Sequence, residues 1–212
     1  KGLKPYFLKK PFVVLDYIDE WDRFLDVVEY FLANKEPDIY IREICIDGVD
    51  TKFIQKHQKI LDVLISHLKD KEPLKTLANF AFEKRYNLKY PLAQVRFRIL
   101  DEKFYICGLS DITLCIDEFK NLGIECENIY IVENKITTLS FMRLKNSMVI
   151  FGSGYGITVL KDVRWLDNKK IYYWGDIDLD GYAILSQLRG YFKNVTSLMM
   201  DLKTLERFKS IS

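Results

Sequence analysis

Three aspartates that alternate along one short stretch carry the clearest chemistry in this chain: Asp176, Asp178 and Asp180. They follow an apolar run at residues 171–174 and precede Gly181, where a helical pattern begins. A strand of period two puts Asp176 and Asp178 on the same side at its carboxyl end, the edge where ligands bind in parallel α/β sheets. Carboxylates this close repel one another, which favours a compensating basic partner or a hard cation such as Mg²⁺.

The alternative role for these aspartates is structural, because an Asp at a strand-to-helix turn often caps the helix. We assign capping to Asp180, which stands beside Gly181. One cap is enough for one helix, and a second acid facing the same way adds only repulsion. Capping therefore does not account for Asp176 and Asp178 together.

Composition sets the broad class. The chain has 212 residues, of which 49% are hydrophobic, so it can form one large domain or two small ones with real cores. A net charge of +2 neither requires nor excludes a polyanionic partner. The cysteines form no CxxC pair and are interpreted as reduced thiols of a cytoplasmic protein. No apolar stretch is long enough to span a membrane. Because the chain begins with Lys1 and not with Met, we expect a piece of a longer protein.

Residues 1–125 are predicted to form a mixed α+β domain. Apolar residues at helical spacing predict helices over 21–32, 53–68 and 74–86, and a short apolar run predicts a strand at 12–15. The stretch 94–100 alternates basic and apolar residues, which is typical of a half-buried strand, with 104–107 as its hairpin partner. Helices that bracket a short turn are compatible with a winged-helix-like module.

Five basic residues are candidates for contacts with DNA phosphates. Arg96 and Arg98 lie on the wet face of the predicted strand, where a solvated pair is equally consistent with the pattern. Lys52 and Lys56, with His57, could face DNA from the second helix, although a solvated charged face is the simpler interpretation. Lys135 could neutralise a phosphate or pair with a neighbouring acid.

From residue 126 to 212 the pattern changes to short apolar strands alternating with helices. Strands are predicted at 129–132, 148–151, 171–174 and 196–200, and helices at about 136–142, 156–165, 181–191 and 202–209. Such βαβ units predict a parallel four-stranded sheet. Glu133, the glycine-rich turn 152–156 and the aspartates then share one edge. The glycine-rich turn could bind phosphate with its backbone or could be only a tight connection.

Glu133, followed by Asp176-Ile-Asp178 and Gly181, resembles the Toprim fold of type II topoisomerases and of topoisomerase VI A/Spo11-like proteins. Longer stretches, 48–54, 95–101, 131–135 and 173–178, are similar to the JetD family, the nuclease subunits of bacterial Wadjet anti-plasmid systems. The similarity runs from about residue 40 to the end. It implies a winged-helix-like CAP domain before a Toprim domain, with an extended N-terminal arm of the family absent.

The resemblance also implies a function and its residues. Glu133, Asp176 and Asp178 would be catalytic and would bind Mg²⁺ or Mn²⁺, with Asp180 as an auxiliary ligand. The protein would cut double-stranded plasmid DNA as a homodimer, together with an SMC-like complex. Topoisomerase VI relatives carry a nucleophilic tyrosine in a stretch that here reads Arg42-Glu-Ile-Cys45-Ile46 and has no tyrosine at that place. Water is therefore expected to attack the phosphodiester, and Cys45 is better explained as a small core residue.

Two functions from other classes remain open. A non-catalytic DNA-binding or scaffolding module would have a degenerate Toprim site, but the glutamate and the Asp-x-Asp pair are both present. A primase-type nucleotidyl transferase could use the same acids, and it would need further nucleotide-binding elements that we do not identify.

Overall fold

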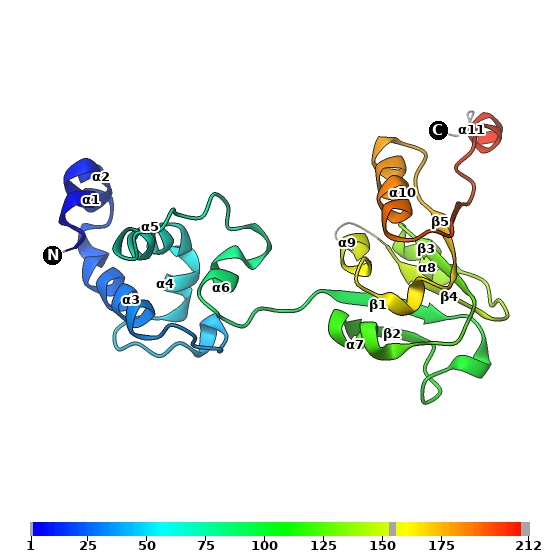
Figure 1. Cartoon of the computed structure of the whole chain (residues 1–212), viewed down its shortest axis with the longest axis horizontal. Helices are drawn as coiled ribbons and strands as arrows, with labels where there is room; N and C mark the ends of the chain where they lie inside the picture. The colour runs from blue at the N-terminus through cyan, green and yellow to red at the C-terminus, as the bar shows by residue number, and fades with distance from the viewer. Residues whose placement is uncertain (1, 153–155, 209–212) are drawn as a thin grey trace. The chain divides into compact units, whose positions relative to one another are not determined.

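A computed structural model describes residues 2–152 and 156–208 of the chain (Figure 1). The chain divides into two compact units, Lys1–Pro91 and Leu92–Ser212, called unit 1 and unit 2 below. The predicted boundary between residues 125 and 126 lies further along, inside unit 2. The division falls earlier because the stretch after residue 92 pairs with the later strands, as described below.

Unit 1 is built from helices around one apolar core. Its α-helices are α1 (Lys4–Lys9), α2 (Pro11–Asp16), α3 (Trp21–Ala33), α4 (Thr51–Lys56), α5 (Gln58–Leu68) and α6 (Ala81–Arg85), and its short 3₁₀ helices are η1 (Ile18–Glu20), η2 (Ile41–Glu43) and η3 (Ala78–Phe80). Phe24 and Phe31 of α3 are buried with Leu61 and Leu64 of α5, as the helical spacing of these apolar residues predicts. The strand predicted at 12–15 is wrong, because those residues belong to α2.

The winged-helix-like form expected of the N-terminal domain is not confirmed. Within residues 2–91, β-structure is limited to isolated bridges between Tyr40 and Lys89 and between Ile46 and Val49. The helix predicted at 74–86 is reduced to η3 and α6, because Asn79 and Phe80 both adopt positive φ and interrupt it. The described residues of unit 1 therefore form helices, and they do not form the β-hairpin of a wing.

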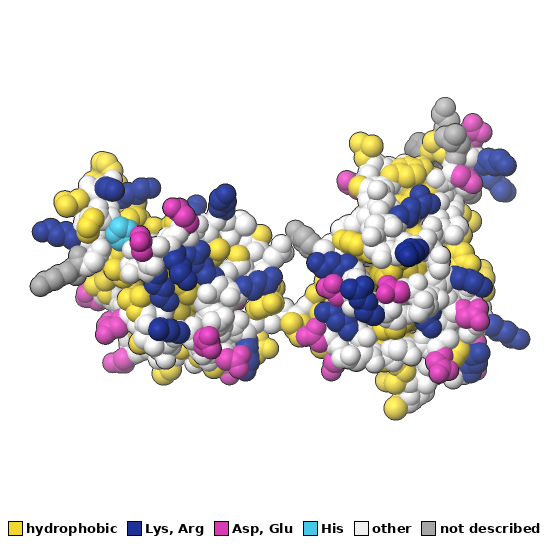
Figure 2. All heavy atoms as spheres, in the orientation of Figure 1, with side chains coloured by type: hydrophobic (Ala, Val, Ile, Leu, Met, Phe, Trp, Pro, Cys, Tyr) yellow, Lys and Arg dark blue, Asp and Glu magenta, His cyan; other side chains and the backbone are white. Residues whose placement is uncertain are grey.

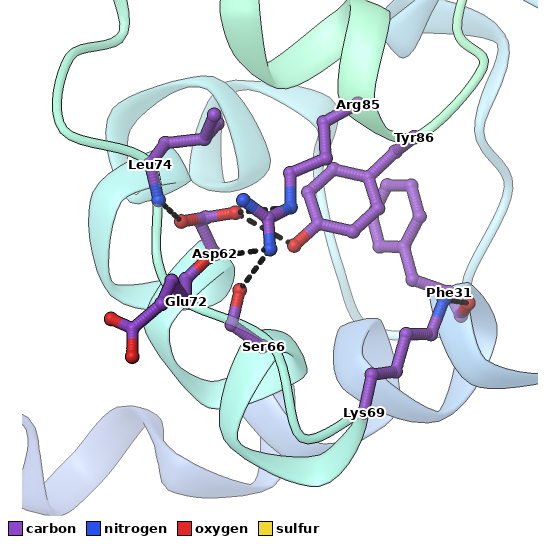
Figure 3. A network of polar contacts seen from close by, with 8 residues as sticks. All are labelled: Phe31, Asp62, Ser66, Lys69, Glu72, Leu74, Arg85 and Tyr86. Carbon is purple, nitrogen blue, oxygen red and sulfur yellow. Dashed lines mark hydrogen bonds and ion pairs between the residues drawn. The ribbon is translucent and has the colours of Figure 1, made fainter.

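A buried carboxylate ties the segment after α5 to the core of unit 1 (Figure 3). Asp62 is 1% exposed and accepts hydrogen bonds from the Tyr86 hydroxyl at 2.8 Å and from the Leu74 amide at 2.6 Å. Its Oδ1 also lies 3.3 Å from Nε of Arg85, whose guanidinium donates to the Ser66 hydroxyl at 2.9 Å. Burial, and then the Asp62 carboxylate, raises the pKa of Tyr86, which keeps its hydroxyl a donor.

Unit 2 contains a mixed six-stranded sheet. Its strands are β1 (Gln94–Ile99), β2 (Asp111–Cys115), β3 (Asn128–Val132), β4 (Ser147–Phe151), β5 (Lys170–Trp174) and β6 (Val195–Ser197), in the order β2-β1-β4-β3-β5-β6. The four strands predicted to be parallel are present and parallel, as β4-β3-β5-β6. The prediction of a four-stranded sheet is wrong, because β1 adds antiparallel to β4 and β2 adds antiparallel to β1.

The hairpin partner of β1 also differs from the prediction. Residues 104–107 lie at the end of the 3₁₀ helix η4 (Glu102–Phe104) and in the turn that follows, and β2 takes the place beside β1. Burial alternates along β1 as expected for a strand with one wet face. The hairpin thus extends the sheet of unit 2 instead of belonging to a separate N-terminal domain.

Helices cover both faces of this sheet (Figure 1). They are α7 (Ile116–Leu122), α8 (Lys135–Ser140), α9 (Gly156–Leu160), α10 (Leu179–Tyr191) and α11 (Leu202–Phe208), with the 3₁₀ helix η5 (Arg164–Leu166). The larger core combines Ile131 and Tyr173 of the sheet with residues of α7, α9 and α10. A smaller cluster on the other face combines Val132 with Phe141 and Trp174. Among the described helices, none has the length and apolar character needed to cross a membrane.

We expect that Tyr86→Phe lowers the free energy of unfolding by about 2 kcal/mol in urea denaturation, because it removes a hydrogen bond to a buried carboxylate. Tyr90→Phe is the matched control, since this hydroxyl has no hydrogen-bond partner among the described residues, and it should change stability by less than about 0.5 kcal/mol. Equal effects of the two substitutions would show that the Asp62 network contributes nothing specific.

Candidate functional site

The parallel register of β3 and β5 positions Glu133. Val132 pairs with Trp174 at the ends of these strands, and the Glu133 amide donates to the Trp174 carbonyl at 3.2 Å. The backbone hydrogen bonding between β3 and β5 thus continues one residue beyond the end of β3. Glu133 therefore leaves the sheet beside the segment that carries Asp176, although 43 residues separate the two in the sequence.

Two donors from β5 and its extension hold the Glu133 carboxylate. Its Oε2 accepts from the Tyr173 hydroxyl at 3.1 Å and from the Asp176 amide at 3.4 Å. Tyr173 is fully buried, and burial followed by the adjacent Glu133 carboxylate raises the pKa of its hydroxyl. The hydroxyl therefore remains protonated and orients the carboxylate.

The role of Tyr173 is not found by sequence analysis, which treats it only as an apolar strand residue. A signal is nevertheless present. Tyr173 and Gly175 are two residues apart, and a Cβ on Gly175 would lie 2.2 Å from the tyrosine hydroxyl and 2.9 Å from Glu133 Oε2. An aromatic hydroxyl followed at strand spacing by a glycine indicates a close approach on that side of the strand.

A second glycine permits the turn that presents the aspartates. A Cβ on Gly181 would lie 2.1 Å from the Asp176 carbonyl oxygen, far inside van der Waals contact. The Gly181 amide in turn donates to Asp178 Oδ1 at 2.8 Å. Residues 176–181 thus form a tight turn in which Gly181 packs directly against the backbone of Asp176.

The three aspartates have different surroundings. Asp176 is exposed, and its carboxylate has no hydrogen-bond or ion-pair partner among the described residues. Asp178 is the N-cap of α10, which begins at Leu179, so the assignment of the cap to Asp180 is wrong. Asp180 lies exposed in the first turn of α10. Asp178 takes the cap because the helix starts two residues earlier than the apolar pattern indicates.

Glu133, Asp176 and Asp178 share one edge of the sheet, but their carboxylates do not converge. In the described part of the chain, no group of three or more His, Cys, Asp or Glu side chains is arranged to hold a metal ion. Glu133 is turned toward Tyr173 and Asp178 toward the start of α10. Carboxylate oxygens are donors that suit Mg²⁺ or Mn²⁺ and not zinc, so the donor set is chemically appropriate. Metal binding stays a prediction.

Both candidate arginines of unit 2 are engaged within the unit. Arg96 makes a bidentate pair with Asp111 across β1 and β2, with Nε–Oδ1 at 3.0 Å and Nη2–Oδ2 at 2.7 Å. Arg98 donates to the carbonyls of Thr138, at 3.0 Å, and Leu139. Arg98 therefore fastens the C-terminal turn of α8 to β1, which is a structural role.

Lys135 is the basic candidate that lies nearest to the acids in the sequence. It is exposed at the first position of α8, two residues after Glu133. The intervening Asn134 caps the helix by accepting from the amides of Ile136 and Thr137. The cap fixes the course of the chain from the acid to the lysine.

The candidates of unit 1 divide into exposed and buried groups. Lys52 and Lys56 are exposed on α4. His57 is 5% exposed and packs against the rings of Phe24 and Phe53, so the idea that it faces DNA is wrong. Burial lowers its pKa, and its Nε2 has no hydrogen-bond partner in the part of the chain that the structure describes.

Two further expectations have different outcomes. Cys45 is exposed, so its interpretation as a core residue is wrong. The glycine-rich turn 152–156 has its central residues, 153–155, outside the described part of the chain. Gly152 is buried, and a Cβ there would lie 2.5 Å from the Ile131 side chain, which explains this one glycine by packing.

Unit 2 is thus an α/β unit whose parallel strands end in carboxylates at one edge. The profile of a known family, described as "Wadjet protein JetD, C-terminal", matches residues 88–212, which is more than half of the chain. A second profile, described as an uncharacterized protein conserved in bacteria, N-terminal (DUF3322), matches residues 2–66. The chain therefore belongs to the JetD family of Wadjet proteins, as the sequence motifs predict.

The family profiles also extend the similarity. The motifs reach back only to about residue 40, whereas the N-terminal profile begins at residue 2. The JetD profile begins at residue 88, close to the division between the two units at residues 91 and 92. No curated protein matches the chain.

We expect that Gly181→Ala lowers the free energy of unfolding by about 2 kcal/mol, because the new Cβ collides with the Asp176 carbonyl, a backbone atom that cannot step aside. The matched control is Gly190→Ala in the same helix, where nothing lies within 4 Å of the added Cβ. It should be neutral or stabilise by up to about 1 kcal/mol. Chemical denaturation followed by circular dichroism measures both, and shifts of the same sign would contradict the role given to Gly181.

Proposed function

We propose that this protein is the metal-dependent DNA endonuclease subunit of a Wadjet system and that it hydrolyses phosphodiesters of plasmid DNA. The observation that carries the proposal is the junction of β3 and β5, where the Glu133 carboxylate lies within hydrogen-bond reach of the Asp176 amide. Oxygen ligands at the carboxyl edge of parallel strands thereby come from two segments that are distant in the sequence. Membership of the JetD family supports the same proposal.

In this proposal, each acid has a separate task. Glu133 is held in place by Tyr173, whereas the Asp176 carboxylate is exposed and free to turn toward a ligand. Glu133, Asp176 and Asp178 would hold Mg²⁺ or Mn²⁺, with Asp180 as an auxiliary ligand. An ion held there would supply Lewis acidity for the phosphoryl oxygen and for the attacking water. Asp178 would leave its capping bond to Gly181, or share it, when it takes part.

The attacking group in this proposal is water. An oxygen–phosphorus bond forms, the bond from phosphorus to the 3′-oxygen breaks, and the proton lost by water reaches the leaving oxygen through solvent. No tyrosine occupies the place in 42–46 where relatives carry a nucleophile, and the exposed Cys45 gives no stable alternative ester. Lys135, Lys52 and Lys56 would contact DNA phosphates in this proposal, which their exposure supports.

A second candidate function is a non-catalytic DNA-binding or scaffolding subunit. One observation favours it, namely that the carboxylates of the described residues do not converge on a common point. The two functions differ in metal binding, because a scaffolding subunit needs no ion at Glu133, Asp176 and Asp178. Calorimetry with Mn²⁺ therefore separates them even before cleavage is tested.

The proposed partners are double-stranded DNA, an SMC-like complex and a second copy of this chain. Winged-helix-like CAP and Toprim domains would then form the two functional parts. An apolar groove of about 910 Å³ in unit 1 supports a second copy. Figure 2 shows apolar side chains over α1 and α2. Among the residues that line the groove, Leu8 and Leu15 are 74% and 61% exposed. The segment carries lysines in α1, at its start, and acidic residues at and after the end of α2. An antiparallel pairing about a two-fold axis matches these opposite charges.

We expect Asp176→Asn to reduce linearisation of supercoiled plasmid by at least about 100-fold in Mg²⁺ or Mn²⁺, with the SMC-like partners present, because it removes a proposed metal ligand. The control is Asp162→Asn, an exposed acid outside the site, which should cut at the parental rate. In parallel, Asp178→Asn should weaken Mn²⁺ binding in calorimetry. Binding as tight as that of the parent would show that the metal assignment is wrong.

A dimer that contains one Asp176→Ala subunit should nick plasmid where the parental dimer linearises it, because each subunit is proposed to cut one strand. Tagged co-expression and sequential purification give the mixed dimer, and gel electrophoresis distinguishes nicked from linear DNA. A mixed dimer that makes double-strand breaks at the parental rate would contradict one active site per strand.

A further inference from the structure

The face of β5 opposite Tyr173 carries a second feature at the same edge of the sheet. A pocket of about 290 Å³ opens there between the strand end and the segment around α8, and its lining is apolar with two hydroxyl-bearing residues: Thr137, Ser140, Phe141, Met142, Leu144 and Trp174. None of these side chains has a role in the site described above, to which Trp174 contributes only its backbone. The pocket lies entirely within unit 2.

Residues of the pocket lie close in the sequence to the acids that follow both strands of the site, β3 and β5. Trp174 stands two residues before Asp176, and two residues of extended chain span at most about 7 Å. Thr137 belongs to α8, which begins two residues after Glu133. The pocket and the acids therefore meet at the carboxyl edge of the sheet, where a ligand that extends around the end of β5 can contact both.

The walls of the pocket suit a flat ring. Trp174 and Phe141 are half-buried, with ring centroids 6.5 Å apart and planes at 67°, so the two rings form a corner and do not cover each other. Met142 stands at the rim and is 70% exposed. Thr137 and Ser140 are the lining residues that can hydrogen-bond the edge of a ring. The volume lies at the lower end for small-molecule sites, enough for one ring system and too little for a helix or strand.

We propose that this pocket holds a single unstacked nucleobase of the DNA, by stacking on Trp174, while the phosphate of the same or the next nucleotide lies at Glu133 and Asp176. The proposal rests on the proposed function, and it adds a group that positions the substrate. Exposed aromatic faces hold bases of any sequence, because every base has a π-face. A base leaves the stack at least cost where the duplex is mismatched, bent or locally open. The site therefore selects distorted DNA over relaxed duplex.

Arg98 makes the pocket a rigid part of the unit. Its bonds to the Thr138 and Leu139 carbonyls hold the end of α8, and Phe141 follows directly after that helix. Phe141 also packs against Tyr130, at 5.0 Å between centroids, and Tyr130 stacks on Tyr172. The aromatic corner is thus packed against side chains of the sheet, although Phe141 itself lies in the connection between α8 and β4.

The test uses the full chain with Ca²⁺ in place of Mg²⁺ or Mn²⁺, so that a cation can compensate the acids and the phosphate while DNA stays uncut. Fluorescence anisotropy measures the affinity for a labelled duplex with a central mismatch and for the matched duplex. We expect Trp174→Ala to weaken binding to the mismatched duplex about tenfold and to abolish the preference for it. Trp174→Phe, which keeps an aromatic face, should retain most of both. Phe80→Ala, which removes an exposed aromatic of unit 1, is the control and should change neither.

A second readout separates stacking from a merely structural effect. The chain has three tryptophans, so Trp21→Phe with Trp165→Phe leaves Trp174 as the single tryptophan. Its fluorescence should be quenched on binding oligothymidylate. If DNA binds without quenching this fluorescence, and if Trp174→Ala binds DNA with unchanged affinity, the base pocket is overturned. The proposed function would still stand. An unchanged DNA affinity with weaker assembly with the SMC-like partner would assign the pocket to a protein side chain instead. No DNA binding by the parent would overturn both the proposed function and the pocket.

Discussion

The hydrogen bond from the Tyr173 hydroxyl to Glu133 joins the two strands on which the candidate site depends. It forms because β3 and β5 are adjacent and parallel in a register that sets Val132 beside Trp174. A shift of one residue would turn Glu133 to the opposite face of the sheet. The buried tyrosine therefore links the register of the sheet to the direction of a carboxylate, and Gly175 leaves the space in which they meet.

Consecutive residues of β5 serve opposite faces of unit 2. Tyr173 points into the larger core and reaches Glu133, whereas Trp174 belongs to the smaller cluster under α8. Because strand side chains alternate, one short strand can orient an acid on one side and line an aromatic pocket on the other. The turn that follows then presents Asp176, with Gly181 packed against its carbonyl. Three functions of the edge are thereby fixed by nine consecutive residues, 173–181.

Much of unit 2 follows from the sequence, and the exceptions have physical causes. The four parallel strands are predicted because each is a short apolar run that ends in glycine or a polar residue. The strand β2 is missed because its short sequence, Asp111-Ile-Thr-Leu-Cys115, runs directly into α7 with no turn residue between them, and because it gains its stability from pairing with β1. Glu133 and Asp176 lie at the same edge of the sheet, as predicted. Their contact is a hydrogen bond from the backbone amide of Asp176 to the Glu133 carboxylate. The cap is misassigned because Asp178 and Asp180 satisfy the same local pattern, and Tyr173 is missed because a hydroxyl partner across strands leaves no periodic signal.

The bonds from Arg98 to the end of α8 have a consequence for how unit 2 can be divided. A fragment that began at residue 126 would contain every acid of the site and all four parallel strands. It would nevertheless lack β1, leave the edge of β4 unpaired, and free the carbonyls that Arg98 satisfies. Such an exposed strand edge promotes association between molecules. The smallest piece suited to recombinant production and to grafting between relatives therefore begins near Leu92, ahead of the hairpin.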